Sequence, residues 1–357
     1  MKMLIRVIKY MEIKNFDLND KKNKNQRNLG IEILRFFLCF RVVLLHYYSL
    51  DNEYILSLKK NRFQVACFFF ISFYFLFPII SQRNIKIFKL RLERLLIPYV
   101  IYPIIIWIIN NLMFLLIKFN RYRRILTLND LKTQIIIGRG IYGISVLWFH
   151  FNLIFLTIFF FIFSFILKDY YLPIFQIIAV LSYKYQYSGI NKIFFKQYSQ
   201  NIWMSVGNLL ETFPIAICAF TFASFNFHQI LLKNKKKSFF FSFLLIYILS
   251  NYRIFKRVKG FSSAGFQNIF TSITLFSFFY LLPYENLNSN LLLIIKQITK
   301  FTQGIYCLHF LFQYYMKLKI EENGSFFGCI ILYFISYLAS FIGFIIFNKT
   351  ELKYLFI

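Results

Sequence analysis

Long apolar stretches alternate with short polar, mostly basic segments along almost the whole chain. A helix that crosses a bilayer needs about 20 apolar residues. Ten stretches are candidates, and they are 31–50, 63–81, 95–118, 146–167, 170–184, 203–226, 239–252, 266–283, 301–317 and 326–347. Two of them, 170–184 and 239–252, are short enough to be tilted or re-entrant. The pattern predicts an all-α fold, a polytopic transmembrane helix bundle of about ten transmembrane helices.

The beginning of the chain differs from the rest because it is polar and basic. It contains no apolar core ahead of a small-residue cleavage site, which argues against a cleaved signal peptide. We interpret residues 1–29 as a cytosolic basic tail and residues 30–350 as a single transmembrane domain. An even number of crossings places both termini on the same side of the membrane.

The orientation of this topology depends on where the basic residues lie. Lysines and arginines divide almost evenly between the two sides, so their number alone is a weak guide. The dense basic blocks, which are the tail, "RNIKIFKLRLER" and "KNKKK", all fall on the side of the termini. The sequence therefore predicts a multi-pass protein of the cell (inner) membrane with both termini cytoplasmic.

Composition supports this class of protein and excludes others. Hydrophobic residues make up 59% of the chain, whereas soluble domains are nearer 45–50% apolar. The net charge of +28 would suggest a nucleic-acid partner on a soluble chain. Here the basic residues lie between apolar stretches, where they face anionic lipid headgroups. The expected partner is the lipid bilayer, and no nucleic acid is expected.

The cysteines point to neither a metal nor a redox centre. All five fall singly inside apolar stretches, and no CxxC pair is present. Spacings of that kind are needed for a zinc or thioredoxin-like site. We expect no metal site and interpret the cysteines as small buried residues of helices.

The first apolar stretch contains charges that need an explanation. In "LRFFLCFRVVLLHYY", Arg35 and His46 are eleven positions apart, which places them within about 20° on a helix and about 16 Å apart along it. Glu32 lies one turn before Arg35 on the same stripe. A charge at the membrane centre costs about 2.5–3.5 kcal/mol on insertion scales. The pattern favours a polar seam turned into the bundle, and the alternative is a snorkelling Arg35 with a structural His46.

Further candidates lie later in the chain. Arg91 and Arg94 in "RLER" are one turn apart at a membrane boundary, where two guanidinium groups can bind phosphates. The alternative is an ordinary basic boundary. His150 in "LWFHF" and His309 in "GIYCLHF" are the remaining candidates, although single histidines in helices are more often core residues.

These motifs together resemble the acyltransferase 3 family of multi-pass membrane O-acyltransferases. Arg35 and His46 match the family's Arg or Lys, ten residues, then His in the first helix. Arg91 and Arg94 match its R-x-x-R, and "LWF", "GIYCLH" and "NLLETFPIAICAF" are similar to later signatures. Two positions depart from the pattern: Phe73 follows Ser72 where a glycine is usual, and Arg41 replaces an apolar residue.

The resemblance implies an enzyme that acylates cell-surface glycans. It implies that an acyl group, expected to be acetyl, is taken from acetyl-CoA as donor substrate and given to a hydroxyl of a carbohydrate or lipid-linked glycan. No permanently bound cofactor is expected. His46 suits the general base because its unperturbed pKa is near 6.5. Arg35 is the second expected catalytic residue, and Arg91 and Arg94 are expected to bind the donor.

Two other classes of function fit the same residues. In a transporter or flippase of lipid-linked glycans, Arg35 and His46 would line a substrate path. Such proteins tend to have inverted repeats with broken helices, and no matched pair of Gly/Pro-interrupted segments is present in this sequence. The departures from the family pattern also permit a protein that keeps the fold of the family but has lost the enzymatic activity.

Overall fold

The computed structural model describes residues 28–47, 63–117, 125–137, 147–187, 202–250, 263–282, 284, 287–316 and 326–355. Within these ranges the chain is helical and contains no strand, which confirms the all-α prediction. The helices are α2 (Leu29–Tyr47), α4 (Phe63–Ser81), α5 (Ile85–Ile117), α6 (Leu128–Ile137), α7 (Leu147–Leu167), η1 (Lys168–Tyr170), α8 (Tyr171–Tyr187), α10 (Ile202–Ser224), α11 (Phe227–Lys233), α12 (Lys235–Ser250), α13 (Ser263–Leu281), α14 (Ser289–Lys300), α15 (Thr302–Met316), α16 (Phe326–Phe347) and η4 (Glu351–Leu355). The predicted tail 1–29 lies outside the described residues except for its last two positions.

Several of these helices are long and apolar enough to cross a membrane. By length and composition, the described residues contain four such stretches, which are Phe63–Ser81, Ile85–Leu116, Trp148–Ser182 and Phe327–Phe347. A fifth is counted if Leu209–Ser224 and Phe227–Lys233, which meet at a bend of 55°, form one span. The protein is therefore a membrane protein, and the figure of about ten crossings stays a prediction.

The turn between α4 and α5 shows how the sequence sets helix ends. Arg83 has a φ of 51°, in the left-handed region that interrupts a helix. Asn84 follows it, and its Oδ1 accepts a hydrogen bond from the backbone N–H of Ile87 at 3.0 Å. An asparagine in this position caps the start of a helix. Helix α5 therefore begins at Ile85 rather than at the predicted residue 95, and the basic block "IKIFKLRLER" is part of the helix.

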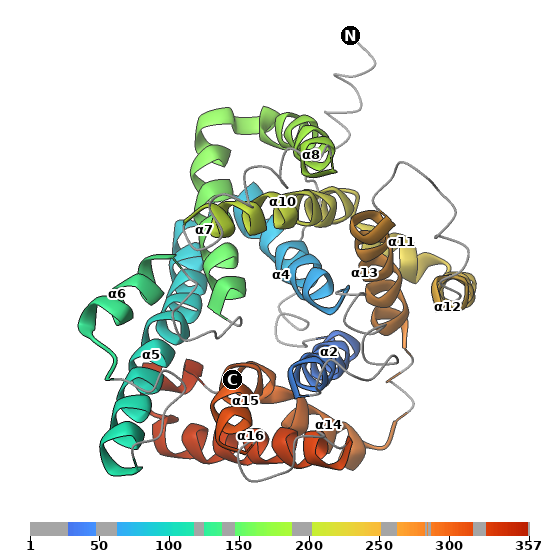
Figure 1. Ribbon diagram of the computed structural model, residues 1–357. Helices are drawn as coiled ribbons and strands as arrows, with labels where there is room; N and C mark the ends of the chain where they lie inside the picture. Colours follow the sequence, from blue (N-terminus) through green and yellow to red (C-terminus); the bar gives the residue numbers. More distant parts are fainter. Residues whose placement is uncertain are drawn as a thin grey trace.

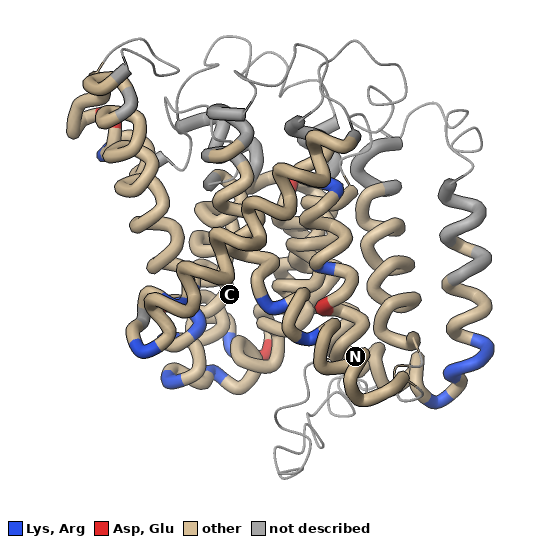
Figure 2. Tube along the Cα trace, turned by 90° about the horizontal axis from the view of Figure 1, so that it is seen from below, with Lys and Arg blue, Asp and Glu red and all other residues tan. Residues whose placement is uncertain are grey.

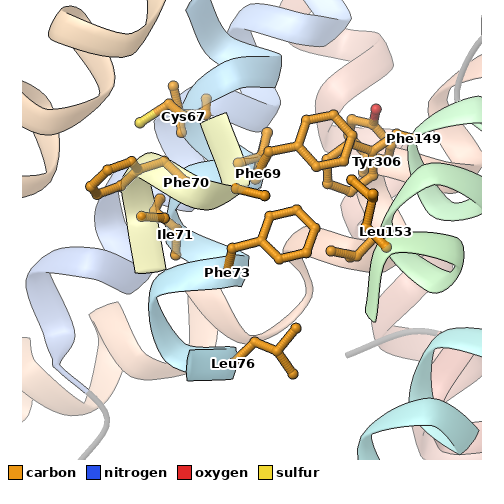
Figure 3. Packing of buried hydrophobic residues seen from close by; sticks show 14 of the residues in the cluster. Cys67, Phe69, Phe70, Ile71, Phe73, Leu76, Phe149, Leu153 and Tyr306 are labelled. Atoms are coloured by element: carbon orange, nitrogen blue, oxygen red, sulfur yellow. The ribbon is translucent and has the colours of Figure 1, made fainter. Parts of the chain in front are cut away.

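Helix α4 lies in the middle of the bundle and packs against α2, α5, α7, α10 and α13 (Figure 1). Its Phe69 ring lies 4.4 Å from the ring of Phe149 in α7, measured between centroids, and Figure 3 shows this contact beside Tyr306 of α15. Phe73, at the position where a glycine is usual, is fully buried and packs against Phe160 and Phe220. The bulk of Phe73 thus fills the space between α4, α7 and α10.

The first described helix approaches α13 so closely that only glycine fits. A Cβ atom added to Gly30 would lie 1.7 Å from the backbone oxygen of Phe279. Just before it, Asn28 donates a hydrogen bond from Nδ2 to the Tyr280 carbonyl at 3.3 Å. These two contacts fix where α2 begins relative to the end of α13.

We therefore expect Gly30→Ala to separate α2 from α13 and lower the stability of the bundle. The substitution overpacks a backbone contact, and overpacking commonly costs about 1–3 kcal/mol. Thermal unfolding of the purified protein in detergent measures this loss as a lower Tm. Leu116→Ala on the exposed side of α5 (77% exposed) is the control, and a Gly30→Ala protein as stable as this control would contradict the packing.

Candidate functional site

The charges on α2 form an ion pair inside the helix. Arg35 Nη1 lies 3.5 Å from Glu32 Oε1, one turn earlier, and both side chains are at least partly shielded from solvent. Opposite charges three residues apart lie on the same face of a helix. The structure thus confirms the prediction that Glu32 and Arg35 lie next to each other on one face of the helix.

The helix that carries this pair also carries His46. Helix α2 is continuous from Leu29 to Tyr47, so Arg35 and His46 belong to one helix and are about 16 Å apart along its axis. This is the separation along one helix that the sequence predicts. The side chains of residues 45–47 lie outside the described part of the chain, and the role of His46 stays a prediction.

Arg91 reaches from α5 to the backbone of α4. Its Nη2 donates a hydrogen bond to the Ser72 carbonyl oxygen at 2.8 Å. Arg91 is removed from solvent, and the positive charges of Arg35 and Arg94 also act on it. Three of the four predicted site residues therefore influence one another electrostatically, although they come from two separate helices.

Arg94 lies one turn further along α5 and is exposed. Its guanidinium carbon lies 5.2 Å from the ring centroid of Tyr354 in η4, in a cation–π contact. Lysines and arginines of the described chain gather mostly toward one end of the bundle in Figure 2. A cluster of cations with several unused N–H groups is suited to bind an anionic ligand such as a phosphate.

The two other candidate histidines are buried on either side of one tyrosine. The rings of His150 and His309 each lie 6.1 Å from the ring of Tyr306, measured between centroids. His309 Nδ1 lies 3.2 Å from the Ile305 carbonyl oxygen. Because a carbonyl only accepts, Nδ1 carries the hydrogen in the neutral ring and Nε2 carries a lone pair.

Helix α15, which carries His309, also contacts α2. Cys39 Sγ of α2 donates a hydrogen bond to the Thr302 carbonyl oxygen at the start of α15, at 3.5 Å.

No metal site accompanies these groups in the described residues. Within the described ranges, no group of three or more His, Cys, Asp or Glu side chains is arranged to hold a metal ion. All five cysteines are free thiols, and four of them are fully buried.

A comparison with protein families identifies the chain. A family model described as an acyltransferase domain matches residues 28–349. The chain belongs to the acyltransferase 3 family. Comparison with curated proteins and with solved structures gives no match. The family match confirms the resemblance seen in the sequence, and it contains Arg35, His46, Arg91 and Arg94 but ends before η4.

Two features of this acyltransferase could not be found from motifs. The Ser72 backbone carbonyl accepts a hydrogen bond from Arg91. Every residue type has such a carbonyl, so no sequence motif indicates this contact. Tyr354 contacts Arg94 from a segment 260 positions later and outside the family match. Arg41, the other departure from the family pattern, lies with its guanidinium 4.0 Å from the Phe63 ring centroid.

Proposed function

We propose that this membrane acyltransferase moves an acetyl or similar acyl group from acyl-CoA to a hydroxyl of a cell-surface or lipid-linked carbohydrate. The observation that carries the proposal is that Arg91 and Arg94 lie one turn apart on α5, with the positive charge of Arg35 also acting on Arg91. Acyl-CoA is a polyanion with a phosphate-rich end and a neutral thioester end. A cationic mouth on an apolar bundle complements this distribution of charge.

The reaction needs one group that accepts a proton. The acceptor oxygen attacks the thioester carbonyl, its proton passes to a base, and the carbon–sulfur bond breaks to release the coenzyme A thiolate, which takes up a proton. His46 suits the base because imidazole exchanges a proton near neutral pH. Arg35, held by Glu32, supplies positive charge on the same helix and on the donor side.

The separation along α2 gives the two substrates different entrances. Arg35 lies in the second turn of α2, whereas position 46 lies about three turns beyond it. A donor that enters from the cytosol would place its phosphates on the arginines and extend its thioester along α2. The carbohydrate would then meet the thioester near His46, closer to the far face.

We expect Arg91→Ala and Arg94→Ala each to weaken the binding of coenzyme A about ten- to a hundredfold. A charge-assisted hydrogen bond contributes about 1.5–3 kcal/mol, and about 1.4 kcal/mol corresponds to a factor of ten. Calorimetry with coenzyme A and the purified protein measures the Kd. Lys89→Ala, an exposed cation on the same helix, is the control, and wild-type affinity in both arginine variants would remove them from the donor site.

We expect His46→Ala to abolish acyl transfer while the protein still inserts into the membrane. Without a base, the acceptor hydroxyl keeps its proton and is a poor nucleophile. Mass spectrometry of surface glycans from producing cells measures acylation, and immunoblotting of membranes measures protein level. Phe37→Ala, an exposed position of α2 (57% exposed), should retain transfer. Full acylation in the His46→Ala strain would exclude His46 as the base.

The orientation of the bundle can be tested independently of the chemistry. In a background without native cysteines, we expect Lys86→Cys and Lys236→Cys to react with a membrane-impermeant thiol reagent only after permeabilisation. Asn129→Cys should react on intact cells. All three positions are exposed. Labelling of Lys86→Cys on intact cells would place the arginines outside, where no acyl-CoA is found, and would favour a transport function.

A further inference from the structure

A short segment after the last long helix packs back into the bundle beside the arginine cluster. Figure 1 shows this red end of the chain next to α5, and η4 (Glu351–Leu355) contacts both α5 and α16. Leu355 is only 2% exposed, and its carbonyl oxygen accepts a hydrogen bond from the hydroxyl of Tyr102, which is also buried. The segment is therefore fixed to α5 by an apolar and a polar contact, and it lies outside the family match.

Tyr354, the residue before Leu355, makes a cation–π contact with Arg94. The guanidinium carbon of Arg94 lies 5.2 Å from the Tyr354 ring centroid, and the Lys353 ammonium lies 5.1 Å from the same centroid. A ring attracts a cation through its π face and uses none of the N–H groups. Arg94 is thus held in place while its planar fork of donors remains available to an anion.

Arg91 is held in a different way, because one of its N–H groups is used in a hydrogen bond to the protein. Its Nη2 hydrogen bonds to the Ser72 carbonyl oxygen, on the side of α4. The two arginines are one turn apart on α5 and have different anchors. Arg91 is bound to the backbone of α4, and Arg94 lies against the Tyr354 ring of η4. Arg94 and Lys353 therefore both lie beside the ring of Tyr354 where η4 packs against α5. Cations beside an aromatic ring match a nucleotide, whose phosphates need positive charge and whose base can stack.

We propose that η4 forms one wall of the site for the nucleotide end of the acyl-CoA donor, and that Tyr354 is a positioning residue for Arg94. This inference rests on the proposed use of acyl-CoA. It adds a part of the binding site that lies beyond the family match. The nucleotide is the most charged part of the donor, so it stays at the basic mouth while the pantetheine arm enters the bundle.

Calorimetry on the full-length protein in detergent tests this wall with three probes. These are coenzyme A, adenosine 3′,5′-bisphosphate as the nucleotide end alone, and pantetheine as the arm alone. We expect Tyr354→Ala to raise the Kd of the first two by about three- to thirtyfold, the range that a cation–π contact supports. The Kd of pantetheine should not change. Tyr354→Phe keeps the ring and should bind all three probes as the wild type does.

The variants also show whether Tyr354 acts through Arg94. If it does, Tyr354→Ala should add nothing to the Kd of Arg94→Ala, because the two residues belong to one unit. Tyr170→Ala, which removes an exposed tyrosine elsewhere (68% exposed), is the matched control. Melting temperatures measured on the same samples report folding, and Tyr354→Leu, which keeps apolar bulk but has no π face, carries the test if the alanine variant unfolds.

Three results would overturn the inference, and they differ from a failure of the proposed function. Wild-type affinity of Tyr354→Ala for coenzyme A and for the bisphosphate would remove η4 from the site. Tighter binding in Tyr354→Ala would make η4 a plug that competes with the donor. An equal loss of affinity for pantetheine would show that the Tyr354→Ala substitution disturbs the binding site as a whole and not the nucleotide end alone. If the wild-type protein binds none of the three probes, the use of acyl-CoA is itself wrong.

Discussion

A charged side chain in an apolar bundle is stable only where a partner offsets the loss of water, and this constraint arranges the arginine cluster. Moving an ion out of water costs several kcal/mol even after the protein relaxes. Arg35 is paired with Glu32, Arg91 with the Ser72 carbonyl, and Arg94 with an aromatic ring. Each partner also fixes the direction of its guanidinium group. The interactions that make the charges tolerable thus also orient the three side chains.

The aromatic packing around α4 sets the positions of these partners. Phe69 and Phe73 interlock with rings of α7 and α10, so α4 is held at a fixed height in the bundle. Its Ser72 carbonyl is the anchor of Arg91, and any shift of α4 would move that anchor. The close contact at Gly30 fixes α2 against α13 in the same way. The geometry of these arginines therefore depends on the packing of α4 and on the close approach of α2 to α13.

The sequence predicted the helices and the Glu32–Arg35 pair because helical periodicity and spacing are local properties. It also predicted the family, because the motifs at Arg35, His46, Arg91 and Arg94 are short and contiguous. It placed the start of α5 ten residues too late, because basic residues were taken as a boundary although Asn84 caps a helix that includes them. The contacts of Arg91 with a backbone oxygen and of Arg94 with Tyr354 depend on the packing of distant segments, which no local pattern contains.

The central claim is that one helix, α2, connects a phosphate-binding end with a catalytic histidine. A structure of the protein with a non-hydrolysable acyl-CoA, in which carbon replaces the thioester sulfur, tests this claim most directly. The account predicts that the phosphates contact Arg91 and Arg94 and that the acyl carbonyl lies about three turns along α2, beside His46. Phosphates bound at the opposite end of the bundle, or an acyl group remote from α2, would contradict it.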